Sequence, residues 1–210
     1  MKIIGFECGP IGTNAFYLYR EGETPAVLID APPGAGEKVR ALQEKTETTV
    51  KTLLLTHGHW DHMLDAEPIR SGGARVYAHP DDRILLENPE VMASFAMPGL
   101  DWTPAKVDEW LRGGEILELL GERVTVRHVP GHAPGSLLFY FPNAASAFGG
   151  DALFAGGVGR FDLPGGDWEL LETSIREQIY SLPDETVVYP GHGPNTTVGR
   201  EKQNNPYVRA

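Results

Sequence analysis

Cysteine is almost absent from the sequence: Cys8 is the only one among 210 residues. A single thiol cannot form an intramolecular disulfide, and a chain without a pair of cysteines offers no zinc site of the finger kind. We expect Cys8 to be a small core residue. Any metal that the chain binds must therefore be held by histidine and carboxylate side chains.

Basic residues are also scarce, and long apolar runs are missing. Lysine and arginine number 18 against 29 acidic residues, so the net charge is −11 at pH 7. This excess of negative charge argues against general binding of nucleic acid or anionic lipid. Residues 1–15 contain no apolar run of the length typical of a signal peptide, so none is expected, and no stretch of about 18 consecutive apolar residues occurs. We expect a soluble, cytoplasmic protein without nucleic-acid or membrane partners.

Short apolar segments separated by turn residues run along the whole chain, in which glycine (25) and proline (17) are frequent. β-Branched and aromatic runs predict strands at residues 2–7, 15–19, 25–30, 50–56, 74–79, 115–119, 123–129, 136–141, 145–150 and 185–190. Amphipathic spacing predicts helices at residues 36–45, 80–87 and 167–182. Residues 88–112 are expected to form a long connection with helical pieces. No repeat or linker divides the chain, so we expect one α/β domain over residues 1–210.

The stretch THGHWDH, residues 56–62, follows the apolar run of residues 50–56 directly. On extended backbone His57 and His59 leave the same side of the chain, and Asp61 and His62 follow where the chain turns into a helix. Such a cluster lies where ligand sites of α/β proteins usually lie, beyond the C-terminal end of a central strand. Imidazole nitrogen and carboxylate oxygen without thiolate suit zinc, iron or manganese.

Three more ligand-type residues follow predicted strands in glycine-rich turns. His132 lies in VPGHAPGS, Asp151 follows ASAFGG, and His192 lies in YPGHGP. Glycines beside a ligand let the backbone bend sharply and approach closely. The remaining His79 and His128 have no ligand-like neighbours, and we expect structural or surface roles for them. We therefore expect His132, Asp151 and His192 to join the cluster of residues 57–62.

Together, the motifs THGHWDH, PGHAPGS, GGDALF and YPGHGP resemble the metallo-β-lactamase superfamily, whose signature is H-x-H-x-D-H. The resemblance covers nearly the whole chain and implies an α/β fold of the αββα sandwich type that carries two metal ions. It also implies the ligands: His57, His59 and His132 on one ion, Asp61, His62 and His192 on the other, and Asp151 as the bridge.

Two metal ions about 3.5–4 Å apart can share a hydroxide and polarise the carbonyl that it attacks. The sequence has no G-x-S-x-G elbow that would supply a serine nucleophile. With aspartate at position 151 the chain resembles the glyoxalase II branch of the superfamily. True β-lactamases usually carry a cysteine at the matching position. A thiolate leaves without obligatory protonation. We expect a hydrolase that cleaves an S-2-hydroxyacyl thioester, such as an S-lactoyl thiol, through a hydroxide bridging two metal ions. Zinc is expected first, with iron or manganese as alternatives, and Asp61 is a catalytic candidate that could orient the nucleophile.

We expect the residues that contact the substrate to lie in residues 149–167, which resemble the corresponding stretch of glyoxalase II-like hydrolases. Arg160 could bind an anionic group of the substrate or buttress the loop through a pair with Asp162. We expect Phe161 to serve packing. Only a short tail follows His192, so we expect no separate C-terminal helical domain, and glutathione is not assumed as the thiol.

Two other activities stay open. The stretch from Gly157 to Asp162 matches the G-x-G-R-x-D of persulfide dioxygenases, in which a mononuclear iron would be held by residues matching His57, His132 and Asp151. The glycines around His192 favour the hydrolase instead. A lactone or other ester hydrolase of the same fold is the second alternative. The physiological thiol, the acyl group and the oligomeric state are not identified by the sequence.

Overall fold

Apolar runs in the first half of the chain pair into a six-stranded sheet with the strands in sequence order. The computed structural model describes residues 1–209 and divides into two compact units, Met1–Trp110 and Leu111–Ala210. The strands of the first unit are β1 (Lys2–Cys8), β2 (Thr13–Tyr19), β3 (Pro25–Ile29), β4 (Thr49–Leu54), β5 (Arg75–Ala78) and β6 (Glu109–Trp110). The first three form the expected antiparallel meander, and the pairs from β3 to β6 are parallel.

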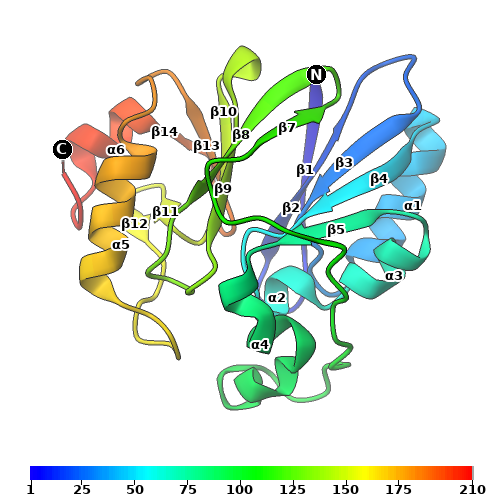
Figure 1. Cartoon of the computed structure of the whole chain (residues 1–210), viewed down its shortest axis with the longest axis horizontal. Helices are drawn as coiled ribbons and strands as arrows, with labels where there is room; N and C mark the ends of the chain where they lie inside the picture. Colours follow the sequence, from blue (N-terminus) through cyan, green and yellow to red (C-terminus); the bar gives the residue numbers. More distant parts are fainter. Residues whose placement is uncertain (210) are drawn as a thin grey trace. The chain divides into compact units, whose positions relative to one another are not determined.

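The helices of the first unit connect these parallel strands. They are α1 (Ala35–Thr46), α2 (Trp60–Met63), α3 (Ala66–Ser71), α4 (Arg83–Glu87) and the 3₁₀ segments η1 (Pro80–Asp82) and η2 (Pro89–Phe95). Figure 1 shows α1 and α3 on one face of this sheet. Leu53 and Val76 are fully buried in β4 and β5, as near-continuous apolar runs of parallel strands predict. The long connection of residues 88–112 contains a helical piece, as expected, and also β6, which was not expected from the sequence.

The second unit is built on another six-stranded sheet, in the order β14-β13-β10-β9-β8-β7. Its strands are β7 (Ile116–Leu119), β8 (Glu122–His128), β9 (Leu137–Phe141), β10 (Ser146–Gly150), β13 (Val187–Pro190) and β14 (Thr196–Thr197). β10 and β13 run parallel, while the other neighbours are antiparallel. A small ribbon of β11 (Leu153–Phe154) and β12 (Gly157–Val158) follows β10.

Helices cover this second sheet on one side (Figure 1). They are α5 (Trp168–Ser174), the π-helical turn η4 (Ile175–Ile179) and α6 (Val198–Asn204). The short 3₁₀ turn η3 (Pro142–Ala144) joins β9 to β10. Asp167 caps α5 by accepting from the backbone N–H of Leu170 at 2.9 Å. Leu171 and Ile175 pack with Leu138 and Val188 in a continuous core. The expected helix at residues 167–182 is present, whereas α6 was not predicted.

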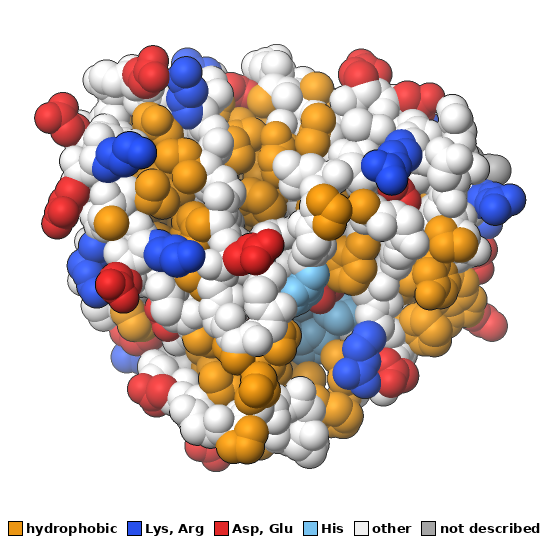
Figure 2. Space-filling view, turned by 180° about the vertical axis from the view of Figure 1, so that it is seen from behind, with side chains coloured by type: hydrophobic (Ala, Val, Ile, Leu, Met, Phe, Trp, Pro, Cys, Tyr) orange, Lys and Arg blue, Asp and Glu red, His pale blue; other side chains and the backbone are white. Residues whose placement is uncertain are grey.

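Within the described residues, no helix is both long and apolar enough to span a bilayer. On the face of the molecule seen in Figure 2, lysine and arginine side chains lie singly among acidic and apolar ones. The expectation of a single domain over residues 1–210 stays a prediction.

Candidate metal centre

The first half-site comprises His57, His59, Asp61 and His62, which all follow strand β4. The strand ends at Leu54, and α2 begins at Trp60, so the last two of the four residues lie on the helix as expected. All four side chains are buried. The ring of His57 lies 4.7 Å from that of His59 and 4.1 Å from that of His62, between centroids. One short loop therefore brings together four ligand-type side chains.

Asp30, at the end of β3, holds this loop from outside the motif. Its Oδ2 accepts hydrogen bonds from His62 Nδ1 and Thr56 Oγ1, both at 2.8 Å, and its Oδ1 accepts from the Thr56 N–H at 2.7 Å. Since Nδ1 of His62 is occupied in this way, Nε2 is the nitrogen that faces the cluster, 3.2 Å from Asp61 Oδ2. A carboxylate that fixes the tautomer of a ligating histidine is typical of metal sites.

Two other polar groups position the first half-site. The hydroxyl of Thr13 donates to Asp61 Oδ2 at 2.8 Å, and the N–H of Gly58 donates to Asp82 Oδ2 at 2.7 Å. A Cβ at Gly58 would lie 2.8 Å from Leu85 Cβ, so the approach of the loop to α4 requires glycine between the two histidines. Sequence reasoning missed Asp30, Thr13 and Asp82.

The second half-site comprises His132, Asp151 and His192 and lies in the second unit. His132 is in the loop between β8 and β9, Asp151 directly follows β10, and His192 follows β13. Because β10 and β13 are parallel neighbours, their C-terminal ends meet at one edge. The Oδ2 atom of Asp151 lies 3.6 Å from His132 Nε2 and 3.5 Å from His192 Nε2. One carboxylate oxygen therefore lies within reach of two imidazoles, which follow different strands.

His132 is oriented by the backbone of the loop after β12. Its Nδ1 donates to the carbonyl oxygen of Arg160 at 2.7 Å, which turns Nε2 toward Asp151. Gly159 permits this contact: a Cβ there would lie 1.8 Å from the carbonyl oxygen of Asp151 and 2.9 Å from His132 Nδ1. The glycine of the sequence GRFD is therefore required by a close approach of two backbone segments.

The side chain of Arg160 pairs with Asp162, which is one of the two roles predicted for it. Nε and Nη2 donate to the two carboxylate oxygens at 2.9 Å each, and both side chains are exposed. The guanidinium beside Asp162 holds the pKa of that carboxyl below its usual range. Phe161 is 40% exposed, and its ring contacts that of Trp168 at 5.1 Å between centroids. Binding of substrate by Arg160 stays a prediction.

Helix α6 in the tail holds the ribbon that follows Asp151. The buried carboxylate of Glu201 accepts from the N–H of Gly156 at 2.9 Å, and Asn205 Nδ2 donates to the Gly157 carbonyl at 3.0 Å. Sequence reasoning missed both residues. Nothing in the local pattern of the tail distinguishes a buried glutamate from the exposed ones.

The structural or surface roles expected for His79 and His128 stay predictions. Contrary to expectation, His79 has a ligand-type neighbour, since its Nδ1 lies 3.7 Å from Asp81 Oδ2. Buried His79 accepts through Nδ1 from the N–H of Asp81 at 3.1 Å and caps η1. His128 donates through Nε2 to the Pro134 carbonyl at 2.8 Å. Cys8 is buried, and burial raises the pKa of its thiol.

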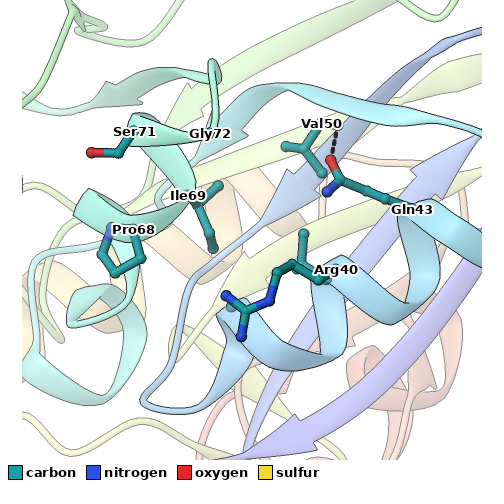
Figure 3. Close-up of a pocket in the computed structure, with 9 residues that line it drawn as sticks. Arg40, Gln43, Val50, Pro68, Ile69, Ser71 and Gly72 are labelled. Carbon is teal, nitrogen blue, oxygen red and sulfur yellow. Dashed lines mark hydrogen bonds between the residues drawn. The ribbon is translucent and has the colours of Figure 1, made fainter.

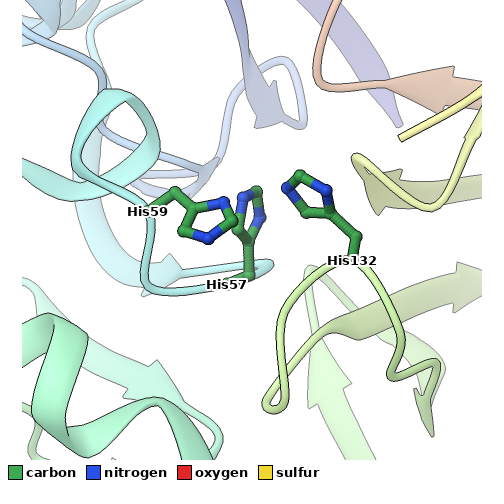
Figure 4. A group of neighbouring side chains, drawn as sticks. All are labelled: His57, His59 and His132. Atoms are coloured by element: carbon green, nitrogen blue, oxygen red, sulfur yellow. The ribbon is translucent and has the colours of Figure 1, made fainter. Parts of the chain in front are cut away.

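The donor set of the two half-sites fits a hard or borderline metal. It consists of imidazole nitrogens and carboxylate oxygens. Among residues 1–209, neither half-site contains a cysteine. Figure 4 shows His57 and His59 on the loop after β4, and His132 on the loop between β8 and β9. The rings of His57 and His59 stand edge to face, and their ligand atoms lie within 4.8 Å of each other.

The family model of the metallo-β-lactamase superfamily matches residues 8–192. The chain therefore belongs to the metallo-β-lactamase superfamily and is a metallo-hydrolase of that class. The hydroxyacylglutathione hydrolase GloC of Haemophilus influenzae is 38% identical over 198 residues, 92% of this chain and 92% of GloC. The probable metallo-hydrolase YqgX of Bacillus subtilis is 35% identical over 209 residues, 99% of this chain and 98% of YqgX. The predicted glyoxalase II-like membership is confirmed.

Solved structures agree on the fold. BLEG-1, described as a B3 metallo-β-lactamase, has a TM-score of 0.90 at 37% identity, with all of both chains covered. TTHA1623, in a di-iron-bound form, has a TM-score of 0.84 at 40% identity over 98% of this chain and 100% of its own. ETHE1 from Myxococcus xanthus has a TM-score of 0.81 at 25% identity, over 99% and 84%. The predicted α/β fold of the metallo-β-lactamase type is confirmed.

Proposed function

We propose that the chain hydrolyses S-2-hydroxyacyl thioesters with two metal ions held by both half-sites. The proposed ligands are His57, His59 and His132 for one ion, Asp61, His62 and His192 for the other, and Asp151 for both. The observation that carries the proposal is the position of Asp151 Oδ2, 3.6 Å from His132 and 3.5 Å from His192. These two histidines belong to different ions in the proposed set, so the carboxylate between them is suited to bridge.

When bound, two such ions supply a hydroxide at neutral pH and polarise the carbonyl that is attacked. The residues around the proposed ions orient the ligand side chains. Thr13 donates to Asp61 Oδ2, which leaves that carboxylate oriented as an acceptor beside His62. We assign Asp61 the further role of orienting the nucleophile. Zinc is the proposed metal, and the di-iron form of TTHA1623 supports iron as the alternative.

A thioester is the proposed substrate because its leaving thiolate needs no proton donor. The similarity to GloC, named a hydroxyacylglutathione hydrolase, supports a 2-hydroxyacyl group. The backbone carbonyl of Arg160 holds His132, and the Arg160 side chain is exposed, so its guanidinium is the proposed contact for an anionic group of the thiol. The pair with Asp162 is exposed and is readily exchanged for such a group.

Two other classes of reaction, persulfide dioxygenation and hydrolysis of a different substrate, are tested by the same experiment. A persulfide dioxygenase would use a single iron held by His57, His132 and Asp151, and the short distance from Asp151 to His192 argues for a second ion instead. Hydrolysis of lactones, other esters or β-lactams would use the same two ions. The β-lactam is included because BLEG-1 is described as a metallo-β-lactamase.

The experiment combines metal analysis with paired assays on protein purified with its native metals. We expect about two equivalents of metal per chain and S-lactoyl thioester hydrolysis with the highest kcat/KM in the panel. One iron per chain with oxygen uptake on glutathione persulfide would overturn the assignment. A higher kcat/KM for a lactone or a β-lactam than for the thioester would contradict the proposed substrate but not the proposed two-metal centre.

A further inference from the structure

A cavity of about 350 Å³ lies between α1 and α3 of the first unit, apart from every proposed metal ligand. Its floor is apolar and buried, made by Val39, Val50 and Ile69. Arg40 and Gln43 of α1 and Ser71 of α3 stand at its rim (Figure 3). Small-molecule sites are typically concave, mostly apolar and about 300–1,000 Å³ in volume, with a few polar groups that orient the ligand. The cavity has this composition and the size for a small ligand.

Arg70 and Arg127, two arginines that line other cavities of the molecule, have partners within the chain. Arg70 donates to Asp108, and Arg127 donates to the Gln178 carbonyl and to Ser181. Among residues 1–209, by contrast, the guanidinium of Arg40 has neither a hydrogen bond nor an ion pair. No acidic residue lines the cavity. A cation without a partner beside an apolar floor favours an anion with an apolar body.

Gln43 adds a donor on the same side. Its Oε1 accepts from the N–H of Val50 at 2.7 Å, which is the dashed contact in Figure 3. Because the oxygen is used, the amide group offers the cavity its NH₂. Both polar groups that α1 presents at the rim are therefore donors, which again suits an acceptor such as a carboxylate.

The two helices that form the walls are tied to each other. The N–H of Gly36, in the first turn of α1, donates to Asp65 Oδ2 at 2.8 Å, directly before α3 begins. A Cβ at Gly36 would lie 3.4 Å from that same oxygen, so the helices meet closely at this end. A preformed site loses less free energy on ordering when a ligand binds.

We infer that this cavity binds a small organic monocarboxylate with a short aliphatic chain. The carboxylate lies against the Arg40 guanidinium and the Gln43 NH₂, and the chain lies on Val39, Val50 and Ile69. The inference uses no metal ligand and does not depend on the proposed reaction.

The test is a titration of the metal-loaded protein with hexanoate, followed through the methyl NMR signals of Val39, Val50 and Ile69. We expect saturable shifts of these methyl signals. Hexanamide, which has the same chain without the charge, should bind at least about tenfold more weakly, since hydrogen bonds to charged groups are about twice as strong as neutral ones. Arg40→Gln should weaken hexanoate binding by a similar factor. The matched control is Arg123→Gln, an exposed arginine of the second unit, which should bind as the native chain does.

Hexanoate bound to the metal ions would be insensitive to Arg40→Gln and would leave these three methyl signals in place, which would overturn the inference. Equal binding of hexanamide would also overturn it, because the cavity would then select chain length alone. Arg40 is exposed, so its replacement should leave the melting temperature unchanged.

Discussion

Asp30 Oδ2 accepts a hydrogen bond from His62 Nδ1 at 2.8 Å across 32 positions of sequence. Asp30 adopts a left-handed backbone conformation, with φ of 59°, at the end of β3. Aspartate and asparagine tolerate this region better than other residues with a side chain. The same carboxylate also receives both the N–H and the hydroxyl of Thr56. The loop that carries His57, His59 and His62 is thus held by the preceding strand of the sheet.

Replacing Asp30 should weaken metal binding although Asp30 is not a proposed ligand. Asp30→Asn keeps the backbone conformation and the size but removes the charge that orients His62. We expect a loss of about 10–100-fold in metal affinity, measured by competition with a chelator. Asp184→Asn, which removes an exposed carboxylate paired with Lys202, is the control and should bind metal normally. Native metal affinity in Asp30→Asn would show that His62 does not depend on this contact.

Replacing Asp151 tests the bridge. Asp151→Ala should lose at least one of the two metal ions and nearly all hydrolysis, because both His132 and His192 lie within 3.6 Å of the oxygen that it removes. Metal content by elemental analysis and turnover of an S-lactoyl thioester measure the two effects. Two retained ions with normal turnover would mean that Asp151 is not the bridging residue.

Gly157, in β12, and Gly159, directly after β12, should respond differently to replacement by alanine. A Cβ at Gly159 would lie 1.8 Å from the Asp151 carbonyl, whereas a Cβ at Gly157 has Phe154 Cβ at an ordinary 3.7 Å. Gly159→Ala should therefore cost about 3 kcal/mol or more in free energy of unfolding and reduce metal content. Gly157→Ala is the control and should keep both. Urea unfolding measures the stability and elemental analysis measures the metal content. Equal stability and equal metal content of the two variants would contradict the packing argument.

The two roles considered for Arg160 separate in a pair of variants. Arg160→Ala and Asp162→Ala both abolish the ion pair of these side chains. If Arg160 contacts the substrate, Arg160→Ala should raise KM for an anionic thioester by about tenfold, whereas Asp162→Ala should leave KM near the native value. Metal content should be native in both, because the Arg160 atom that holds His132 is the backbone carbonyl. Identical KM values for the two variants would assign Arg160 to the loop alone.

The acid sensitivity of the first unit should fall when Asp108 is replaced. Burial raises the pKa of Asp108, but hydrogen bonds from the Val76 backbone and from Arg70 outweigh it and hold the pKa below its usual range. A carboxyl with a lowered folded-state pKa contributes stability above its unfolded pKa of about 3.9, and that stability is lost as pH falls through the folded value.

Asp108→Asn should therefore show a shallower loss of stability below about pH 5 than the native chain. Urea unfolding at a series of pH values measures this slope. Asp101→Asn, which removes an exposed carboxylate of the same unit, is the control. A slope equal to that of the native chain would show that Asp108 does not contribute to the acid response.

The local part of the site was predictable from sequence because its residues are close in the chain. His57, His59, Asp61 and His62 fall within one loop and one helical turn, so strand periodicity and the turn into a helix decide where their side chains point. The positions of His132, Asp151 and His192 were predictable because each follows a recognisable strand in a glycine-rich turn. The strands themselves were predictable because their apolar runs are bounded by turn residues.

The contacts that hold those ligands depend on tertiary structure. Asp30 is distant in sequence from His62, the Arg160 carbonyl is distant from His132, and Glu201 is distant from Gly156. No local pattern distinguishes these partners from other polar residues, because which of them meet depends on how strands pair and helices pack. Helix α6 was missed for the same reason: its sequence VGREKQN is polar, and buried Val198 and Glu201 hold it against the unit. The sequence alone thus determined the types and the order of the proposed ligands, and the packing of distant segments decided how each of these side chains is oriented.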